Sequence, residues 1–232
     1  MIQVRARDLT ALSHEITRCR ACPRLVAWRE EVALEKRAAF RDETYWARPV
    51  PGFGDPRARM LIVGLAPAAH GGNRTGRVFT GDRSGDFLFA SLFRCGFANQ
   101  PESTAVDDGL ALRDAYVAAA VRCAPPANKP TPAERDECAP FLRRELELLD
   151  RVRVIVALGA FGYEATWSAL RASPVLGAGL PARRPRFGHL VEVPGARVTV
   201  LGSFHPSQQN TFTGRLTPDM LDAVFQRAFE LT

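Results

Sequence analysis

Four near-continuous apolar segments set the strongest constraint on the fold of this chain. Each is followed by a loop rich in polar, glycine or proline residues and then by a helical pattern; the segments are Met60–Val63, Ala115–Val121, Val152–Leu158 and Val198–Gly202. Strands that are buried on both faces have this apolar character. Because strand, loop and helix recur four times in this order, the sequence predicts an α/β fold with a parallel sheet covered by helices on both faces.

A chain of 232 residues is long enough for one α/β domain with a sizeable core. The sequence contains no internal repeat and no sign of a second domain, so we expect a single domain over residues 1–232. The N-terminus lacks the apolar region of a secretory signal, and no apolar run approaches the roughly 20 residues that span a bilayer. We therefore expect a cytoplasmic protein that does not bind membranes.

Local patterns place the remaining elements. A helix over residues 8–20 would carry Leu9, Leu12 and Ile16 on one face. Thr131, Pro132 and Glu134 have the spacing of a capping box and predict a helix that continues to about residue 149. We also expect helices over 25–40, 84–97 and 159–172, a surface loop over 41–57, a turn with a short helix over 108–114, an edge strand over 190–193 and a last helix that begins at Thr217.

The loops that follow the strands should gather at the carboxyl edge of the sheet, because parallel crossovers are right-handed. These loops cover residues 64–83, 122–130, 159–161 and 203–215. The longest lies within the polar, glycine-rich segment Gly64–Asp86, GLAPAAHGGNRTGRVFTGDRSGD. Open α/β sheets bind ligands in such places, and a loop this long is usually functional. It matches neither a P-loop nor G-x-G-x-x-G, which argues against a nucleotide cofactor.

The chain is basic, with a formal net charge of +6, and only Lys36 and Lys129 of its 31 basic residues are lysine. Guanidinium groups bind phosphate bidentately and stack on bases. A basic surface therefore indicates a polyanionic partner such as nucleic acid. A solvated basic face without any partner explains the charge equally well.

Five cysteines in a cytosolic protein point to metal binding or catalysis rather than to disulfides. Cys19 and Cys22 form a C-x2-C pair, whereas 14 residues separate Cys123 from Cys138. Four thiolates could hold zinc or an iron–sulfur cluster, and the wide second spacing leaves room for the larger cubane. Four unrelated cysteines remain an alternative. Cys95 lies in a phenylalanine-rich helical pattern and is interpreted as a buried core thiol.

Two histidines lie in the loops at the expected carboxyl edge. His205 directly follows the last strand, and Pro206 restricts the backbone after it. His70 lies in the Gly64–Asp86 segment, which also contains the carboxylate of Asp82. A lone histidine is more often structural than catalytic, but a histidine at the end of a strand in a convergent loop is a better candidate for catalysis.

The chain closely resembles family 5 of the uracil-DNA glycosylase superfamily, the B-type enzymes of bacteria and archaea. The resemblance covers nearly the whole chain and includes GLAPAAHGGNRTGRVFTGD, the His-Pro-Ser triplet at 205–207, the downstream TGRLTP, the C-x2-C pair and RCAPPANKPTPAE. It implies a three-layer α/β/α sandwich with a central four-stranded parallel sheet. It also implies a 4Fe–4S cluster that ties the N-terminal helices to the domain through Cys19, Cys22, Cys123 and Cys138.

The resemblance implies a monomeric DNA repair enzyme that flips uracil out of double- or single-stranded DNA and hydrolyses the N-glycosidic bond. His205 would donate a hydrogen bond to the departing base, Asp82 would orient water or face the sugar cation, and Asn128 would position water or bind the nucleotide. The base pocket would be formed by Phe79, Gly64, Ala66 and His70. Phe79 would stack on the base, with an ordinary core position as the alternative. The residues assigned to phosphates or to the vacated stack are Arg74, Arg77, Ser207, Asn210 and Arg215.

Two departures from related superfamily members affect the expected chemistry. Several relatives carry an acidic or amide side chain in the first motif, where Leu65, Ala66 and Ala68 stand here, so Asp82 is the carboxylate candidate. The second strand also lacks the asparagine that reads uracil in family 4. We therefore expect broader base tolerance, from uracil to hypoxanthine or other deaminated and damaged bases. The alternative function is an iron–sulfur module that binds nucleic acid or transfers electrons without glycosylase chemistry.

Overall fold

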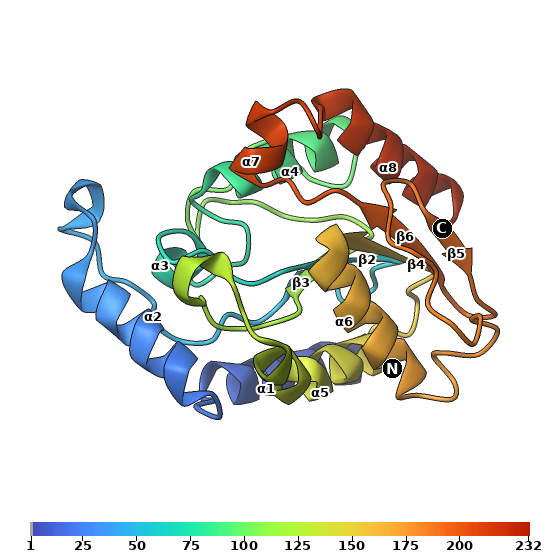
Figure 1. The fold of residues 1–232 in the computed structure, drawn as a ribbon, viewed down its shortest axis with the longest axis horizontal. Helices are drawn as coiled ribbons and strands as arrows, with labels where there is room; N and C mark the ends of the chain where they lie inside the picture. Colours follow the sequence, from blue (N-terminus) through green and yellow to red (C-terminus); the bar gives the residue numbers. More distant parts are fainter. Residues whose placement is uncertain (1) are drawn as a thin grey trace.

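The computed structural model describes residues 2–232, with side chains from Asp8 onward, and contains a six-stranded sheet in the order β1-β3-β2-β4-β6-β5 (Figure 1). The strands are β1 (Phe53–Gly54), β2 (Met60–Gly64), β3 (Ala115–Ala119), β4 (Val154–Leu158), β5 (Glu192–Pro194) and β6 (Thr199–Ser203). The four long strands pair in parallel, which confirms the expected core of the sheet. Short antiparallel strands, β1 and β5, extend it at the two edges, and β1 lies where the sequence indicated only loop.

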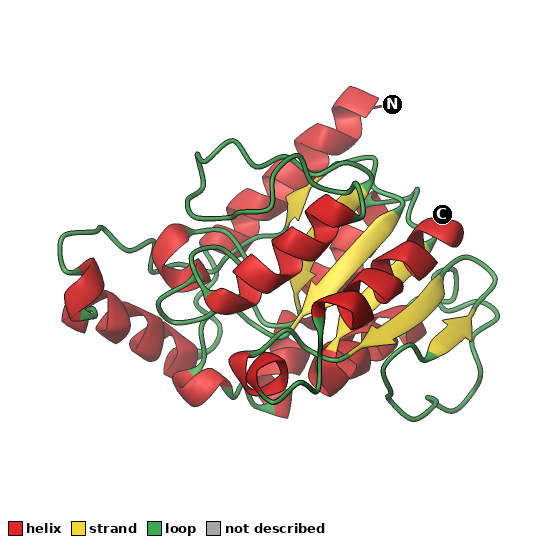
Figure 2. Ribbon diagram, turned by 90° about the horizontal axis from the view of Figure 1, so that it is seen from above, coloured by secondary structure: helices red, strands yellow, loops and turns green. Residues whose placement is uncertain are grey.

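Helices cover both faces of the sheet, which confirms the three-layer arrangement (Figures 1 and 2). One face carries α1 (Ile2–Thr17), α5 (Pro132–Leu148) and α6 (Gly159–Arg171), and the other carries α4 (Arg83–Arg94) and α8 (Pro218–Glu230). Successive side chains of β2 alternate between the layers: Leu61 and Val63 belong to the first core, Met60 and Ile62 to the second. All four are fully buried, as expected for a central parallel strand.

The N-terminal region forms two helices, as the sequence indicated. Leu9, Leu12 and Ile16 are all buried on one face of α1. The second helix, α2 (Pro23–Glu35), projects from the body of the molecule at the left of Figure 1. It is shorter than expected, because Lys36 adopts a left-handed φ of 48° and only a 3₁₀ turn, η1 (Ala38–Phe40), follows.

Two loops at the carboxyl edge contain short helices that the sequence did not indicate. The first is α3 (Gly72–Thr75), within the Gly64–Asp86 segment, and the second is α7 (Gln208–Phe212), after the His-Pro-Ser triplet. The loop after β3 contains a 3₁₀ turn, η2 (Pro126–Asn128). The long loops are therefore folded structures rather than open connectors.

Side-chain caps determine where several helices begin. The predicted capping box at the start of α5 is present: Thr131 Oγ1 accepts from Glu134 N, and Glu134 accepts from Thr131 N. Thr217 caps α8 by accepting from the N–H of Met220. Glu134 also receives two hydrogen bonds of 2.8 Å from Arg24, so the start of α5 is clamped to α2.

The short helix expected over residues 108–114 is absent, and the prediction was wrong. The carboxylate of Asp108 instead accepts hydrogen bonds from the N–H groups of Thr104, Ala105 and Leu110. An aspartate that binds the backbone on both sides favours a turn over a helix. Leu112 then forms an antiparallel bridge with Ala98.

Among the residues that the structure describes, no helix combines the length and the apolar character needed to cross a membrane.

Replacing Thr131 with alanine removes the hydroxyl that caps α5, and we expect the free energy of unfolding to fall by about 1 kcal/mol. Urea-induced unfolding followed by circular dichroism measures this change. Thr213→Ala is a suitable control, because the exposed Thr213 hydroxyl bonds only to neighbouring carbonyls. We expect that control to change stability by less than about 0.5 kcal/mol. Equal losses in the two variants would contradict the role of the cap.

Candidate active site at the carboxyl edge of the sheet

The carboxyl ends of β2, β4 and β6 bring three of the predicted site residues together. The ring of Phe79 lies over Gly64 at the end of β2, so that a Cβ on Gly64 would be 2.6 Å from the ring. His205 follows β6, and its imidazole is 5.8 Å from the Phe79 ring between centroids. The loop after β4 also approaches closely, because a Cβ on Gly159 would be 3.2 Å from Cβ of His205. Gly64, Phe79 and His205 thus form one wall.

Phe79 is held in an unusual backbone conformation. Its φ is 51°, in the left-handed region that bulky residues rarely adopt, and its side chain is 9% exposed. Gly85 at the start of α4 packs directly against the Phe79 carbonyl. Such strain persists only where the surroundings enforce it, and it is concentrated at functional sites. Phe79 also packs with the core between the sheet and α4, as the alternative considered from the sequence expected, whereas stacking on a base stays a prediction.

The imidazole of His205 is available for chemistry. Its nitrogens form no hydrogen bond with any residue that the structure describes, whereas its carbonyl accepts a 2.9 Å hydrogen bond from the Asn210 amide. Burial lowers the pKa of His205 to about 4. The ring is therefore neutral at pH 7, and one nitrogen carries a proton that can be donated in a hydrogen bond.

Asp82 is both the N-cap of α4 and the carboxylate of this edge. Its Oδ1 accepts 3.0 Å hydrogen bonds from the N–H groups of Ser84 and Gly85. Its Oδ2 points toward Gly71, where any side chain would collide with it. Burial raises the pKa of Asp82, although the two backbone N–H groups act in the opposite direction. One oxygen is thus fixed by the helix, and the other is directed into the loop.

His70 is bound to a residue from a different loop. Its Nδ1 lies 2.9 Å from the Tyr45 hydroxyl, and the two rings meet edge to face. Burial and the nearby Arg37 and Arg74 lower the pKa of His70. Trp46, the residue after Tyr45, packs against Gly76 of the same loop as His70. The hydrogen bond between Tyr45 and His70 was missed, because no sequence spacing links residues 25 positions apart in two loops.

The guanidinium groups of Arg74 and Arg77 point into the folded loop, whereas the phosphate contacts expected for them would need these groups at the surface. Arg77 is 5% exposed and donates to Asp108, Ser103 and Thr80 at 2.6–2.9 Å. Arg74 lies 4.1 Å above the ring of Phe40 and donates to Glu43 and to the carbonyl of His70. Their donors satisfy acceptors that the long loop would otherwise leave unpaired. Although burial opposes ionisation, hydrogen bonds from Arg77 and the backbone lower the pKa of Asp108 to about 2.

The segment after His205 presents side chains at the surface. Ser207 is the N-cap residue of α7, and Arg215 is exposed, with its guanidinium 4.7 Å from the Phe204 ring. Phe212 at the end of α7 is 70% exposed and lies 5.9 Å from the Arg83 guanidinium. Phe212 was not among the candidates predicted from the sequence, although a phenylalanine in a polar loop is a signal that points to it.

Asn128 occupies a surface position in η2. It is exposed, and both it and Ala127 have left-handed φ values, of 56° and 52°. No hydrogen bond joins its side chain to Asp82 or His205 in the structure of residues 2–232. Asparagine tolerates this conformation better than other L-residues, which gives a structural reason for its presence in the turn.

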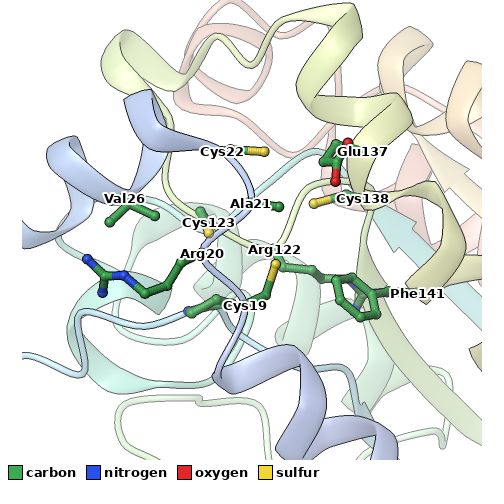
Figure 3. Close-up of a pocket in the computed structure, with 11 residues that line it drawn as sticks. Cys19, Arg20, Ala21, Cys22, Val26, Arg122, Cys123, Glu137, Cys138 and Phe141 are labelled. Carbon is green, nitrogen blue, oxygen red and sulfur yellow. The ribbon is translucent and has the colours of Figure 1, made fainter.

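The four predicted ligand cysteines line one pocket, shown in Figure 3. Cys19 and Cys22 come from the connection between α1 and α2, Cys123 from the loop after β3, and Cys138 from α5. Within residues 8–232, no three His, Cys, Asp or Glu side chains are grouped to hold a single metal ion. The thiols instead line a pocket that is partly open to solvent. Burial raises the pKa values of Cys22, Cys123 and Cys138 to about 11. Cys95 lies apart, half-buried beside α8.

Ala66 lies between the two sites. It packs against the apolar cluster that contains Cys123 and Cys138, whereas Gly64, two residues earlier, lies under Phe79. The assignment of Ala66 to the base pocket stays a prediction. The backbone at 64–66 is shared between the cysteine pocket and the wall formed by Phe79 and His205.

Comparison with known proteins gives consistent matches. Residues 51–229 match the family model described as "Uracil DNA glycosylase superfamily". The chain is 56% identical to a type-5 uracil-DNA glycosylase of Mycobacterium tuberculosis over 97% of its length and 82% of that protein. It is 54% identical to a type-5 enzyme of Thermus thermophilus, covering 97% and 98%, and 53% identical to one of Mycobacterium leprae, covering 100% and 99%.

Replacing Arg77 with methionine leaves Asp108 buried without its partner, and we expect the free energy of unfolding to fall by about 3 kcal/mol. Arg144→Met is the matched control, because Arg144 pairs with Glu15 on the surface and should contribute less than about 1 kcal/mol. Urea-induced unfolding measures both variants. A phosphate-binding arginine would instead leave stability unchanged, so a neutral Arg77→Met would contradict the structural role.

Proposed function

This chain belongs to the uracil-DNA glycosylase superfamily, and we propose from that premise that the wall formed by Gly64, Phe79 and His205, together with Asp82, binds and excises the flipped base. The enzyme removes uracil from DNA by hydrolysing the N-glycosyl bond. The family match argues against the alternative of a binding or electron-transfer module without this chemistry. The observation that carries the proposal is that His205, which follows β6, meets Phe79 above Gly64. Phe79 and Asp82 both belong to the loop that begins at Gly64.

His205 is proposed to stabilise the departing base. Cleavage of the N-glycosidic bond moves electrons onto the base and leaves an oxocarbenium-like sugar. A neutral imidazole can donate its N–H to the base oxygen on which this charge develops, and a pocket that excludes water strengthens that bond. The lowered pKa of His205 keeps the imidazole in this state. The hydrogen bond from Asn210 to the His205 carbonyl holds its backbone in place.

Asp82 is proposed to act on the sugar side of the reaction. Its Oδ1 is occupied by the first N–H groups of α4, whereas Oδ2 remains available to orient a water molecule or to face the sugar cation. Both roles need the ionised carboxylate. We further propose that Asn128, on the η2 turn, positions water or binds the extruded nucleotide once DNA is in place.

Phe79 is proposed to stack on the flipped base next to His205. Neither the apolar first turn of the loop nor the all-apolar strand β3 supplies an amide that could select uracil by paired hydrogen bonds. A pocket without such groups leaves nothing unpaired when another base enters, so it rejects alternatives weakly. We propose that the enzyme also removes hypoxanthine and other deaminated or damaged bases.

The surface around α7 is proposed to contact DNA. Ser207, Asn210 and Arg215 lie in the segment that directly follows His205, and Arg215 is free to meet a phosphate. Phe212 is exposed at the end of the same helix and has the shape of a wedge that could fill the space left by the flipped base. Arg74 and Arg77 have no part in this proposal, because their guanidinium groups are bound inside the loop.

The four cysteines are proposed to hold a 4Fe–4S cluster. A feature of the surrounding protein fits such an occupant: Arg29 is buried directly against Cys123, and its Nε–H has no partner in the described structure. Thiols with pKa values of about 11 also need a bound cation to become thiolates. When bound, the cluster would supply structural anchoring rather than redox chemistry, because hydrolysis moves no electrons to an acceptor.

The roles of Asp82 and His205 can be tested by single-turnover excision from a U·G duplex, with abasic sites measured by alkaline cleavage. Asp82→Asn keeps a good N-cap, so we expect at least a 100-fold slower reaction with little change in stability. Asp82→Ala should be equally slow and also lose about 1 kcal/mol of stability. His205→Ala should slow excision by roughly 10²–10³-fold.

The pH dependence provides a second readout of the same variants. Because burial raises the pKa of Asp82, the wild-type rate should fall on acidification from above the ordinary carboxyl range, and Asp82→Asn should lack this limb. Full activity in Asp82→Asn or in His205→Ala would refute the assigned roles. The same assay on a hypoxanthine-containing duplex tests the proposed base range.

Removing Arg215 should weaken DNA binding in a salt-dependent way. If Arg215 contacts one phosphate, Arg215→Ala should lower the slope of log K against log salt concentration by about 0.9. Arg151→Ala is the matched control, because Arg151 is also exposed but precedes β4 at the opposite edge of the sheet. Binding isotherms at several salt concentrations measure the slopes. Equal slopes for Arg215→Ala and the wild type would exclude the contact.

A further inference from the structure

Arg29 on α2 is a fully buried cation without a carboxylate at hydrogen-bond distance. Its side chain is 2% exposed, and the nearest carboxylate, that of Glu30, lies 4.0 Å away. Glu30 is itself engaged by Arg20 at 2.5 Å near the surface. A buried charge is costly unless a counter-charge compensates it. The structure therefore contains a positive charge whose partner must be sought elsewhere.

The guanidinium of Arg29 is directed at the cysteine pocket. Its Nη1 donates to Cys123 Sγ at 2.9 Å, and its Nη2 donates to the carbonyl of Cys19 at 3.3 Å. Arg122, the other fully buried arginine at this pocket, differs because it forms an ion pair with Glu145. Only for Arg29 are the cysteines themselves the available counter-charge, and they become anionic when they ligate a metal cluster.

The backbone of Arg29 faces the other way, toward the Gly64–Asp86 loop. Its carbonyl accepts a 3.1 Å hydrogen bond from Nδ2 of Asn73, which lies in α3 and has 0% exposure. Asn73 N–H in turn donates to the carbonyl of Ala68, which also accepts from Gly71. Gly71 is the residue against which Oδ2 of Asp82 packs. A continuous path therefore runs from Cys123 through Arg29 and Asn73 to Asp82.

The hydrogen bond to the Arg29 carbonyl holds the Asn73 side chain in place. Its Oδ1 is buried and has no partner among the described residues, so Nδ2 makes its only side-chain hydrogen bond. The contact between α2 and α3 rests on few residues. A loop segment attached in this way depends on where Arg29 is held.

We propose that Arg29 and Asn73 are positioning residues through which the occupied cysteine pocket holds the catalytic loop in its working conformation. The inference rests on the proposed cluster in that pocket and adds the route by which it acts on the distant carboxylate. With the cysteines ligated, Arg29 has its counter-charge and α2 is fixed against α3. Without ligated cysteines, the charge of the buried guanidinium is uncompensated, and the hydrogen bond from Asn73 to the Arg29 carbonyl weakens.

A double-mutant cycle tests this link by amide hydrogen exchange of residues 66–82, measured by mass spectrometry on the purified holoenzyme. Asn73→Ala should increase exchange in this segment about tenfold and slow single-turnover excision by a similar factor, while iron and sulfide contents stay at the wild-type level. Arg29→Met should raise exchange in the same segment and release iron to a chelator several-fold faster. Arg29→Lys, which keeps the charge, should restore part of both properties.

The combined Arg29→Met and Asn73→Ala variant decides the question. If the two residues act through one contact, its exchange in residues 66–82 should not exceed that of the stronger single variant. Ser91→Ala is the control, because Ser91 is equally buried but bonds to Asp222 between α4 and α8. It should leave exchange in the loop unchanged.

Three outcomes would overturn the inference. Additive exchange increases in a cluster-bearing double variant would show that Arg29 and Asn73 act independently, and would leave the proposed function intact. An increase of the same size in Ser91→Ala would show that exchange reports global stability. Wild-type protein that excises uracil but contains no iron and sulfide would remove the cluster and this link together, whereas failure of excision alone would count against the proposed site.

Discussion

The close approach of the Phe79 ring to the backbone of Gly64 is the contact on which the rest of the site depends. It is possible only because β2 ends in a residue without a side chain and because Phe79 accepts a left-handed φ. This contact folds the long loop back over the strand ends, where His205 already lies. The sheet positions the strand ends, but the loop reaches them only if Phe79 turns its ring back onto Gly64. This requirement explains the strained backbone at Phe79.

The long, glycine-rich Gly64–Asp86 loop stays ordered here because the cations of Arg74 and Arg77 are turned inward. Arg77 binds Asp108, Arg74 binds Glu43, and Asp82 caps the helix that follows. Each removes a donor or acceptor that burial would leave unpaired. As a consequence, Arg74 and Arg77 stabilise the loop itself through their ion pairs. The segment that we propose to contact DNA is instead the one after His205, where Arg215 and Phe212 remain at the surface.

The parts of this architecture that the sequence predicts are those with local signals. The apolar strands, the capping box at Thr131 and the convergence of four cysteines all follow from spacing and pattern. The buried position of Arg77 could not be predicted, because an arginine that forms a buried ion pair and one that binds phosphate look alike in the sequence. Its partner, Asp108, lies 31 positions away. The same holds for Tyr45 and His70, and for Arg29, whose importance depends entirely on what surrounds it.

The cysteine pocket and the base pocket meet at the backbone of residues 64–66. Ala66 packs against the cysteine cluster, and Gly64 lies so close to Phe79 that any side chain at Gly64 would collide with the ring. The first turn of the loop, at Leu65, Ala66 and Ala68, contains no carboxylate. The carboxylate that we propose for this site lies instead near the far end of the loop, at Asp82. The loop is thus linked to the cysteine pocket at two places: directly at Ala66, and in its middle through the hydrogen bond from Asn73 to the Arg29 carbonyl on α2.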